Sequence, residues 1–381
     1  MNTYGERRGA LYDWMVRENS ALALFEDAEG RRDPAVSWLS GQPGDAVLFL
    51  YAGKKALLMP WDIHICELYG ESDLVIPYTE FERSPFKALR AALEAFKIPP
   101  GSRVEIPPTT AYPRFLRYVE DFSDFDIVCR SFGVHHEAAA ARAVKDPMEI
   151  GIYRTVSAIT NDIIEQVEER VRAGSIATEQ DAALFIEAAC RDRDCEGTGF
   201  ETIAAGPRRS FAIHAVPAYT KGAFGTAGLS ILDFGLKYRG YTSDVTLTFA
   251  RAPLSRTQER MITLTEKAYR LALSLIRDGA AARDIGAAVD RFLCGAKKRL
   301  VHGLGHGIGL EAHEFPLFST GADNEWTLRA GMVFAVEPGV YDSVQGGCRL
   351  ENDILLTESG PEVLTYGRII RLPAQQPPAV P

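Results

Sequence analysis

The sequence predicts an α+β protein of two domains, in which a smaller mixed α/β domain precedes a larger one. Its 381 residues suffice for two domains with ample core. In the second half, two long stretches each consist of two apolar arms around a polar, glycine-containing turn, which is the pattern of a β-hairpin. Two helix-like segments precede each hairpin. The larger domain is therefore predicted to be an approximate internal duplication.

Residues 1–140 alternate strand and helix signals. Short apolar runs predict strands at 46–51, 55–59, 74–77, 103–106 and 126–128. Residues 86–96 have the apolar spacing of a helix. The histidines of this part, His64, His135 and His136, stand outside any ligand-like motif, so we predict that they bind nothing. This domain is expected to carry no chemistry.

Residues 138–150, AAAARAVKDPMEI, are predicted to join the two domains. Amphipathic spacing then predicts helices from Pro147 to near Gly174 and at 179–192, 259–277 and 284–299. Thr178 followed by Asp181 resembles the N-cap of the second of these helices. The last residues, 369–381, are proline-rich and are predicted to form a loosely ordered tail.

The first hairpin, Leu229–Ala250, carries two aspartates in otherwise apolar arms. Folding it between Tyr238 and Arg239 places Asp233 opposite Asp244. Two facing carboxylates repel each other, and burying them unpaired costs far more. A divalent cation between them would remove both penalties. The alternative is that the register is shifted and one aspartate belongs to the turn.

The second hairpin, residues 331–357, repeats this arrangement with glutamates. Folding it about Val344 places Glu337 opposite Glu351. The glycine-rich run between the two hairpins contains His302, His306 and His313. Four carboxylates and at least one imidazole are a ligand set for two divalent ions, which carboxylates can bridge.

Composition excludes several classes of function. The net charge is −9 and no basic run exists, which argues against a nucleic-acid partner. The six cysteines lack CxxC spacing and are typical of reduced thiols in a cytosolic protein. The N-terminus has no apolar signal core, and no stretch approaches 18 apolar residues. We therefore predict a cytoplasmic protein without a membrane partner.

Five short motifs resemble the metal-ligand motifs of the pita-bread metallopeptidases. They are Asp233 in LDFG, Asp244 in GYTSDVT, His306 in HGLGHGIG, Glu337 in VEPG and Glu351 in RLEND. Within that superfamily the chain resembles the Xaa-Pro peptidases, prolidase and aminopeptidase P, and creatinase. DPAVSWLSG (33–41) and KDPMEI (145–150) resemble segments of the same relatives. The resemblance implies a creatinase-like α/β domain at 1–140 and a pita-bread catalytic domain at 141–368, with two pseudo-symmetric halves around a curved antiparallel sheet.

The resemblance also implies a metal centre. Two divalent ions, manganese first and otherwise cobalt, zinc or iron, are expected on Asp233, Asp244, His306, Glu337 and Glu351. Two of these ligands, Asp244 and Glu351, would bridge the ions. The ions would lower the pKa of a bridging water, so that hydroxide exists near neutral pH, and would polarise the scissile carbonyl. Glu337 is the expected proton shuttle.

Further residues match non-ligand positions of the family. His214 and His313 match two catalytic histidines that would hydrogen-bond the substrate and the oxyanion. His302 matches a histidine that lines the substrate pocket. Arg349 matches a basic residue near the metals, which would orient a ligand or bind a substrate carboxylate. Leu247 departs from the family, which usually has an arginine there, and this leaves the pocket wall undefined.

The predicted function is hydrolysis of the Xaa-Pro bond in di- or oligopeptides with proline at the second position, by a homodimer. Two alternatives remain. The first is a creatinase-like or other small-molecule hydrolase or lyase on the same fold, since fold alone does not define the reaction. The second is a non-catalytic interaction protein, which the complete ligand set disfavours.

Overall fold

The structure, a computed structural model, describes residues 3–375. The chain divides into two compact units, Met1–Ala141 (unit 1) and Arg142–Pro381 (unit 2). None of the six cysteines, all of which lie in the described part, forms a disulfide. Among residues 3–375, no helix combines the length and the apolar character that crossing a membrane requires.

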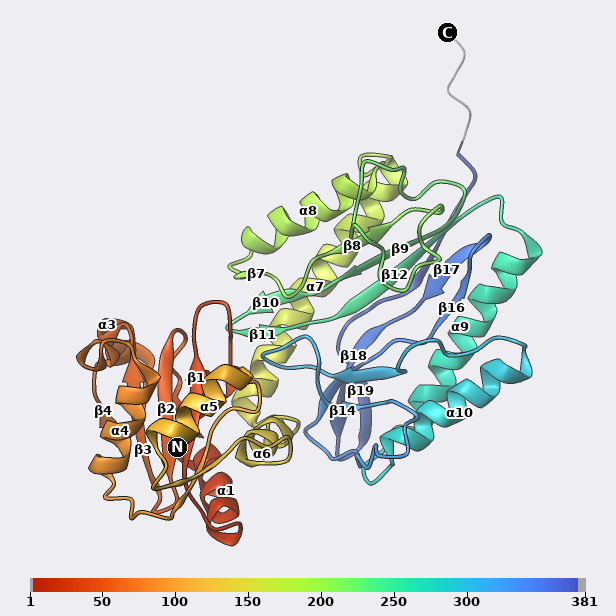
Figure 1. The fold of residues 1–381 in the computed structure, drawn as a ribbon. Helices are drawn as coiled ribbons and strands as arrows, with labels where there is room; N and C mark the ends of the chain where they lie inside the picture. The colour runs from red at the N-terminus through yellow and green to blue at the C-terminus, as the bar shows by residue number, and fades with distance from the viewer. Residues whose placement is uncertain (1–2, 376–381) are drawn as a thin grey trace. The chain divides into compact units, whose positions relative to one another are not determined.

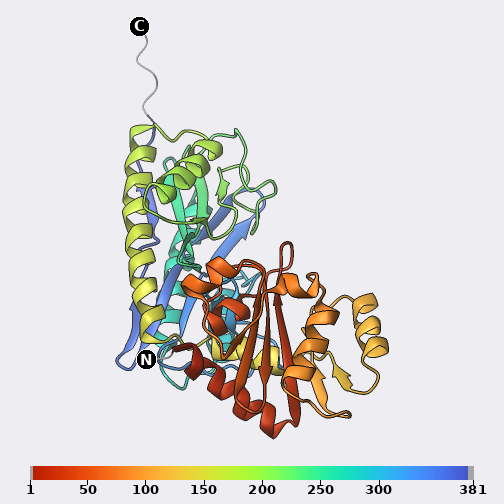
Figure 2. The ribbon, with the colours of Figure 1, turned by 90° about the vertical axis from the view of Figure 1, so that its left-hand side faces the viewer.

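Unit 1 contains a mixed sheet between two layers of helices (Figure 2). Its elements are α1 Thr3–Arg17, β1 Ser20–Asp27, α2 Pro34–Ser40, β2 Ala46–Tyr51, β3 Lys55–Pro60, α3 Ile63–Tyr69, β4 Leu74–Val75, a 3₁₀ turn Tyr78–Phe81, α4 Pro85–Ala95, β5 Arg103–Glu105, α5 Tyr112–Asp121, β6 Asp126–Val128 and α6 Val134–Ala141. The strand order is β4-β3-β2-β1-β5-β6. All five strands predicted for this unit are confirmed, as is the helix at 86–96.

Central strands of this sheet are buried on both faces. One face packs against α1 and α2, and the other against α4 and α5. A strand covered on both sides is apolar at successive positions instead of alternating. β1, with the sequence SALALFED, has the continuous apolar character of such a strand and is the strand of this sheet that was not predicted.

Unit 2 repeats the order of two helices followed by strands. Its elements are α7 Pro147–Ala173, α8 Glu179–Arg191, β7 Gly197–Thr198, β8 Ile203–Ala205, β9 Gly228–Phe234, β10 Leu236–Tyr238, β11 Tyr241–Thr242, β12 Val245–Arg251, α9 Arg256–Leu275, α10 Ala282–Gly295, β13 Gly305–Gly307, β14 Glu314–Leu317, β15 Val333–Val336, β16 Gly339–Asp342, β17 Gly346–Arg349, β18 Asn352–Thr357, β19 Gly360–Val363 and β20 Ile369–Leu372. Helices α7 and α8 lie along one side of the strands, and α9 and α10 along the other (Figure 1). The four predicted helices and the internal repetition are confirmed.

Capping explains where α7 and α8 begin. Asp146 and Glu149 form a capping box at the start of α7, where Pro147 occupies the first turn. Thr178 and Asp181 form a second capping box at the start of α8, as predicted. These reciprocal bonds satisfy backbone N–H groups that have no partner within the helix.

The first hairpin has a different register from the one predicted. β9 pairs with β12 so that Asp233 lies opposite Thr246, and the turn is Arg239-Gly240. Both turn residues have positive φ, 49° and 82°, as a two-residue hairpin turn of type I′ requires. The predicted pairing of Asp233 with Asp244 is therefore wrong by two positions. Since side chains alternate with a period of two, the shift keeps both carboxylates on one face.

The second hairpin has the predicted register. Val336 pairs with Asn352 and Gly339 pairs with Arg349, so the positions between them, Glu337 and Glu351, oppose each other. The predicted tail begins too early, because Ile369–Leu372 form β20, which pairs in parallel with β12 and buries Ile370 and Leu372. Residues 376–381 of that tail lie outside the described residues.

Candidate metal centre

The two hairpins meet at Thr246. Its backbone pairs with Asp233 within the first hairpin and forms an isolated bridge to Glu351 of the second. Its hydroxyl donates to Glu351 Oε2 at 2.6 Å. One threonine thereby brings carboxylates from the two halves of unit 2 into one buried site.

Strand β13 adds the imidazole of His306. His306 lies opposite Ala335 on β15, and Glu337 is two residues further along, on the same face. The glycines on either side of His306 permit this close packing. A Cβ at Gly305 would stand 2.0 Å from the Ala335 carbonyl oxygen, and one at Gly307 would stand 1.9 Å from that of Phe315.

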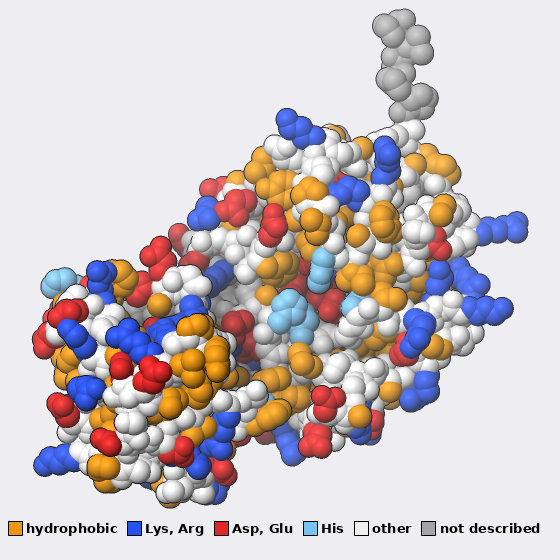
Figure 3. Space-filling view, viewed as in Figure 1, with side chains coloured by type: hydrophobic (Ala, Val, Ile, Leu, Met, Phe, Trp, Pro, Cys, Tyr) orange, Lys and Arg blue, Asp and Glu red, His pale blue; other side chains and the backbone are white. Residues whose placement is uncertain are grey.

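Three buried side chains converge closely enough to hold one ion. Ligand atoms of Asp244, His306 and Glu351 all lie within 4.8 Å of one another. His306 Nε2 is 3.7 Å from Asp244 Oδ2 and 3.9 Å from Glu337 Oε1. On the face of unit 2 shown in Figure 3, histidine and acidic side chains gather in a hollow.

His306 has the protonation state and the orientation of a metal-binding histidine. Burial, and then the neighbouring His313, lower the pKa of His306 to about 4, so the ring is neutral. Nδ1 lies 3.1 Å from the Gly307 carbonyl and donates its proton there. Nε2 then carries the lone pair and faces the carboxylates, which is the usual arrangement of a metal-binding histidine.

The four buried carboxylates of the site have too little positive charge around them for all four to be ionised. Burial, and then the neighbouring carboxylates, raise the pKa of Asp244 and of Glu337 well above the ordinary range, and raise that of Glu351 to about 8. Asp233 Oδ1 and Asp244 Oδ1 are buried without a hydrogen-bond partner in the described part. Divalent cations would supply both the charge and the missing partners, so the donor set fits metal ions.

Among residues 3–375, Arg349 is the one fully buried cation that contacts this group. It is 1% exposed, and its Nη2 donates to Asp233 Oδ2 at 2.5 Å. Nε donates to Thr246 at 3.0 Å, and Nη1 donates to the Ile213 carbonyl at 2.9 Å and to Tyr341 at 3.0 Å. Because four of its five N–H groups are engaged, its contacts favour orienting a carboxylate over binding a substrate.

Three other histidines surround the carboxylates. His302 lies with Nδ1 3.7 Å from Glu337 Oε2 and Nε2 3.0 Å from the Tyr341 hydroxyl, and burial lowers its pKa to about 4. The His313 ring centroid is 4.2 Å from that of His306. Burial raises the pKa of Asp233 and lowers that of His313, and the exposed His214 lies close enough to oppose the first shift and add to the second. The structure thus brings every residue of the predicted site into one region of unit 2.

Sequence reasoning missed three residues that hold this site together. Thr246 links the hairpins, Tyr341 contacts both Arg349 and His302, and Asp353 accepts the Asp244 backbone N–H at 3.0 Å. Asp353 was the one with a detectable signal, because an aspartate in the apolar run of β18 is unusual. Leu247, where the family usually has an arginine, is fully buried in the core of unit 2.

Known proteins resemble this chain in sequence. An Xaa-Pro dipeptidase from Pyrococcus furiosus is 30% identical over 226 residues, which make up 59% of this chain and 63% of that protein. The match therefore spans less than two thirds of that relative. The uncharacterized peptidase YqhT from Bacillus subtilis is 27% identical over 334 residues, or 87% of this chain and 91% of that one.

Solved structures resemble it along its length. An X-Pro aminopeptidase from Thermotoga maritima aligns with a TM-score of 0.81 and 24% identity, covering 97% of this chain and 99% of that one. An Xaa-Pro dipeptidase from Bacillus anthracis aligns with a TM-score of 0.83 and 22% identity over the same shares. These likenesses confirm the predicted fold class, an N-terminal α/β domain followed by a pita-bread domain. Residues 151–358, more than half of the chain, match the model of metallopeptidase family M24, and the protein belongs to that family.

Proposed function

We propose that this protein is a dinuclear metal-dependent peptidase that hydrolyses the Xaa-Pro bond of di- or oligopeptides. The observation that carries the proposal is the buried cluster of carboxylates around the neutral His306, in a chain of a metallopeptidase family. Relatives named as Xaa-Pro dipeptidases and an X-Pro aminopeptidase support the choice of substrate. The creatinase-like and non-catalytic alternatives have no such support.

The proposed ligands are those predicted from the sequence. We assign Asp233, Asp244, His306, Glu337 and Glu351 as the residues that would hold two ions. An oxygen-rich set with one imidazole suits Mn²⁺, and cobalt, zinc or iron are the other candidates. When bound, the ions acidify a water molecule and polarise the scissile carbonyl.

The chain's own residues supply proton transfer and orientation. Glu337 is the proposed proton shuttle, because its carboxylate would contact both a bound ion and the attacking water. We propose that His214 and His313 donate hydrogen bonds to the substrate and to the developing oxyanion. Arg349 holds Asp233 and, through the Ile213 carbonyl, the segment that carries His214.

Two residues shape the rest of the proposed pocket. Tyr341 fixes the orientation of His302, whose low pKa keeps the ring neutral. A neutral imidazole can line the pocket without repelling the cations.

We further propose a cytoplasmic homodimer. The cysteines, none of which forms a disulfide, support the cytoplasmic location. The homodimer is expected from the family resemblance. Light scattering of the purified chain would measure it.

The test is a substrate panel on the full chain loaded with Mn²⁺, with metal content measured separately. Ala-Pro and Ala-Pro-Ala should be hydrolysed, and Ala-Ala, the matched peptide without proline, should not. Chelation should abolish hydrolysis and Mn²⁺ should restore it. Creatine is included for the alternative reaction. A loaded protein that leaves every proline peptide intact would rule the proposal out.

Asp353 provides a test of how the proposed ligand Asp244 is positioned. Asp244 lies between β11 and β12, where its N–H has no ladder partner and donates to Asp353 Oδ2 instead. We expect Asp353→Ala to lower Mn²⁺ affinity by about 10–100-fold, since residues that orient ligands have effects of this size. Asp353→Asn keeps an acceptor and should retain most of the affinity. Calorimetric titration measures this without any assay of activity, and equal losses in the two variants would contradict it.

A further inference from the structure

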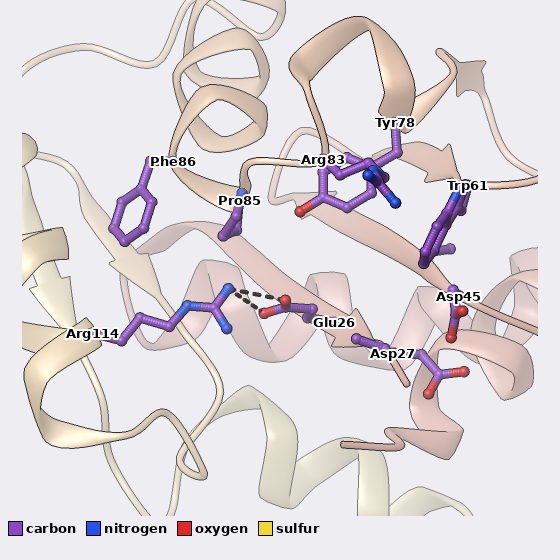
Figure 4. Close-up of a pocket in the computed structure, with 11 residues that line it drawn as sticks. Glu26, Asp27, Asp45, Trp61, Tyr78, Arg83, Pro85, Phe86 and Arg114 are labelled. Carbon is purple, nitrogen blue, oxygen red and sulfur yellow. Dashed lines mark hydrogen bonds and ion pairs between the residues drawn. The ribbon is translucent and has the colours of Figure 1, made fainter. Parts of the chain in front are cut away.

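Unit 1 contains a cavity that the proposed peptidase reaction does not use. It has a volume of about 400 Å³ and opens where β1 ends and β2 begins. Its walls combine charged side chains with the aromatic rings of Trp61, Tyr78 and Phe86 (Figure 4). This volume and mixed lining are typical of a site for a small molecule.

The charges of the cavity are unevenly compensated. Glu26 faces two cations, with Arg31 Nη2 at 2.5 Å and Arg114 Nη2 at 2.7 Å. Asp27 and Asp45, in contrast, share one cation, Arg32. The region around Glu26 therefore has an excess of positive charge, and the region around the two aspartates has an excess of negative charge.

Two of these carboxylates are buried, so solvent screens them weakly. Glu26 is 9% exposed and Asp27 is 8% exposed. Burial raises the pKa of Asp27, whose Oδ1 accepts from the Asp33 N–H at 3.1 Å and whose Oδ2 lies 3.5 Å from Arg32. A ligand that brings a positive charge to the aspartates would improve their pairing.

Arg83 adds a second cationic group at the edge of the cavity. Its guanidinium lies 4.6 Å from the centre of the Trp61 ring and has no carboxylate partner in the described part of the chain. Arg83 and the preceding Glu82 both have positive φ, 54° and 53°. Two consecutive non-glycine residues in this conformation are strained, and the turn holds Arg83 beside Trp61 at that cost.

We propose that this cavity binds a free amino acid with an aromatic or large apolar side chain. The ammonium group lies against Asp27 and Asp45, the carboxylate lies toward Arg114 and Arg83, and the side chain packs on Trp61. A zwitterion suits a cavity in which both signs of charge are present in separate regions. The 42% exposure of Trp61 provides an accessible apolar surface.

A neighbouring hollow supports the position of the ammonium group. It has a volume of about 370 Å³ and shares Asp45 and Trp61 with the cavity. Gln42 lines this hollow, is 1% exposed, and has an Oε1 with no hydrogen-bond partner among the described residues. A buried unsatisfied acceptor in a hollow that a carboxylate also lines favours a ligand with several N–H donors.

The test is calorimetric titration of the full chain with L-phenylalanine. We expect saturable binding of one molecule per chain. Two analogues each remove one charge: 3-phenylpropanoate lacks the ammonium group and 2-phenylethylamine lacks the carboxylate. Each should bind at least about tenfold more weakly, a change of ~1.4 kcal/mol. Equal binding of either analogue would overturn the zwitterion assignment.

Substitutions of residues that line the cavity test whether L-phenylalanine binds there. Trp61→Ala and Asp45→Asn should each weaken binding by about tenfold or more. Tyr69→Ala is the matched control, because Tyr69 is a 59% exposed aromatic residue of the same unit outside the cavity. Glu351→Gln, in the proposed metal centre, should leave binding unchanged whether or not the protein hydrolyses peptides. Absence of saturable binding, insensitivity to Trp61→Ala, or loss with Glu351→Gln would overturn the proposal.

Discussion

Replacing Glu351 with glutamine is expected to abolish peptide hydrolysis while making the metal-free protein more stable. Without a cation, Glu351 is buried among other carboxylates, and this raises its pKa from 4.5 to about 8. Near pH 7.5 the wild-type chain must therefore fold against the cost of protonating this group or of burying its charge. Glutamine removes that cost and keeps an oxygen that accepts the Thr246 hydroxyl. We expect a gain of about 2–4 kcal/mol in the free energy of unfolding.

Activity should change in the opposite direction. Glu351 is a proposed metal ligand, so its loss should lower kcat/KM for Ala-Pro by roughly 10³-fold or more, equivalent to ~4 kcal/mol. Thermal unfolding in the presence of chelator and hydrolysis with added Mn²⁺ measure the two effects. Glu358→Gln, at an exposed position in the turn between β18 and β19, is the matched control and should change neither. A Glu351→Gln protein that is less stable than wild type without metal would contradict the proposed repulsion.

The chelated wild-type protein should lose stability as pH rises from about 6.5 to 8, above the interval in which His302 and His306, whose pKa values burial lowers to about 4, gain stability with pH. The folded-state pKa values of Asp244, Glu337 and Glu351 are raised, so the folded chain binds more protons than the unfolded chain in this interval. The stability that these carboxylates contribute is then highest below their unfolded pKa and falls as pH rises. For Glu351, the loss begins above about 4.5 and levels off above about 8. This residue alone contributes as much as ~5 kcal/mol.

Bound metal should reverse the trend. Ions that bind only the folded chain add about 4 kcal/mol at a free concentration near 1,000 times their Kd. They also prefer deprotonated ligands, so the stabilisation by Mn²⁺ should grow with pH. Urea titrations at several pH values, with chelator and with Mn²⁺, measure both curves. In Glu351→Gln the chelated curve should be shallower, and a curve for the chelated wild type that rises between pH 6.5 and 8 would rule out this account of the site.

Local patterns were sufficient for many elements of the fold. The capping boxes of α7 and α8 and the apolar runs of β2 and β3 depend on neighbouring residues, so they could be predicted. The register of the second hairpin was also predicted correctly. The first hairpin was placed two positions off, because Arg239 adopts positive φ beside Gly240, and a non-glycine residue does so only rarely. The strand β20 was missed because its partner β12 is more than 100 residues away in the sequence.

What the sequence by itself determined was the set of acidic and imidazole side chains, the hairpins that carry them and the family they resemble. Only the tertiary structure decided how these side chains are supported: Thr246 joins Asp233 to Glu351, Arg349 pairs with Asp233, and Asp353 accepts from Asp244. The charge imbalance in the cavity of unit 1 also emerged only there. The physical reason is that the sequence pattern reflects which face of an element is buried. Which polar groups then share hydrogen bonds and charge depends on how segments distant in sequence pack together.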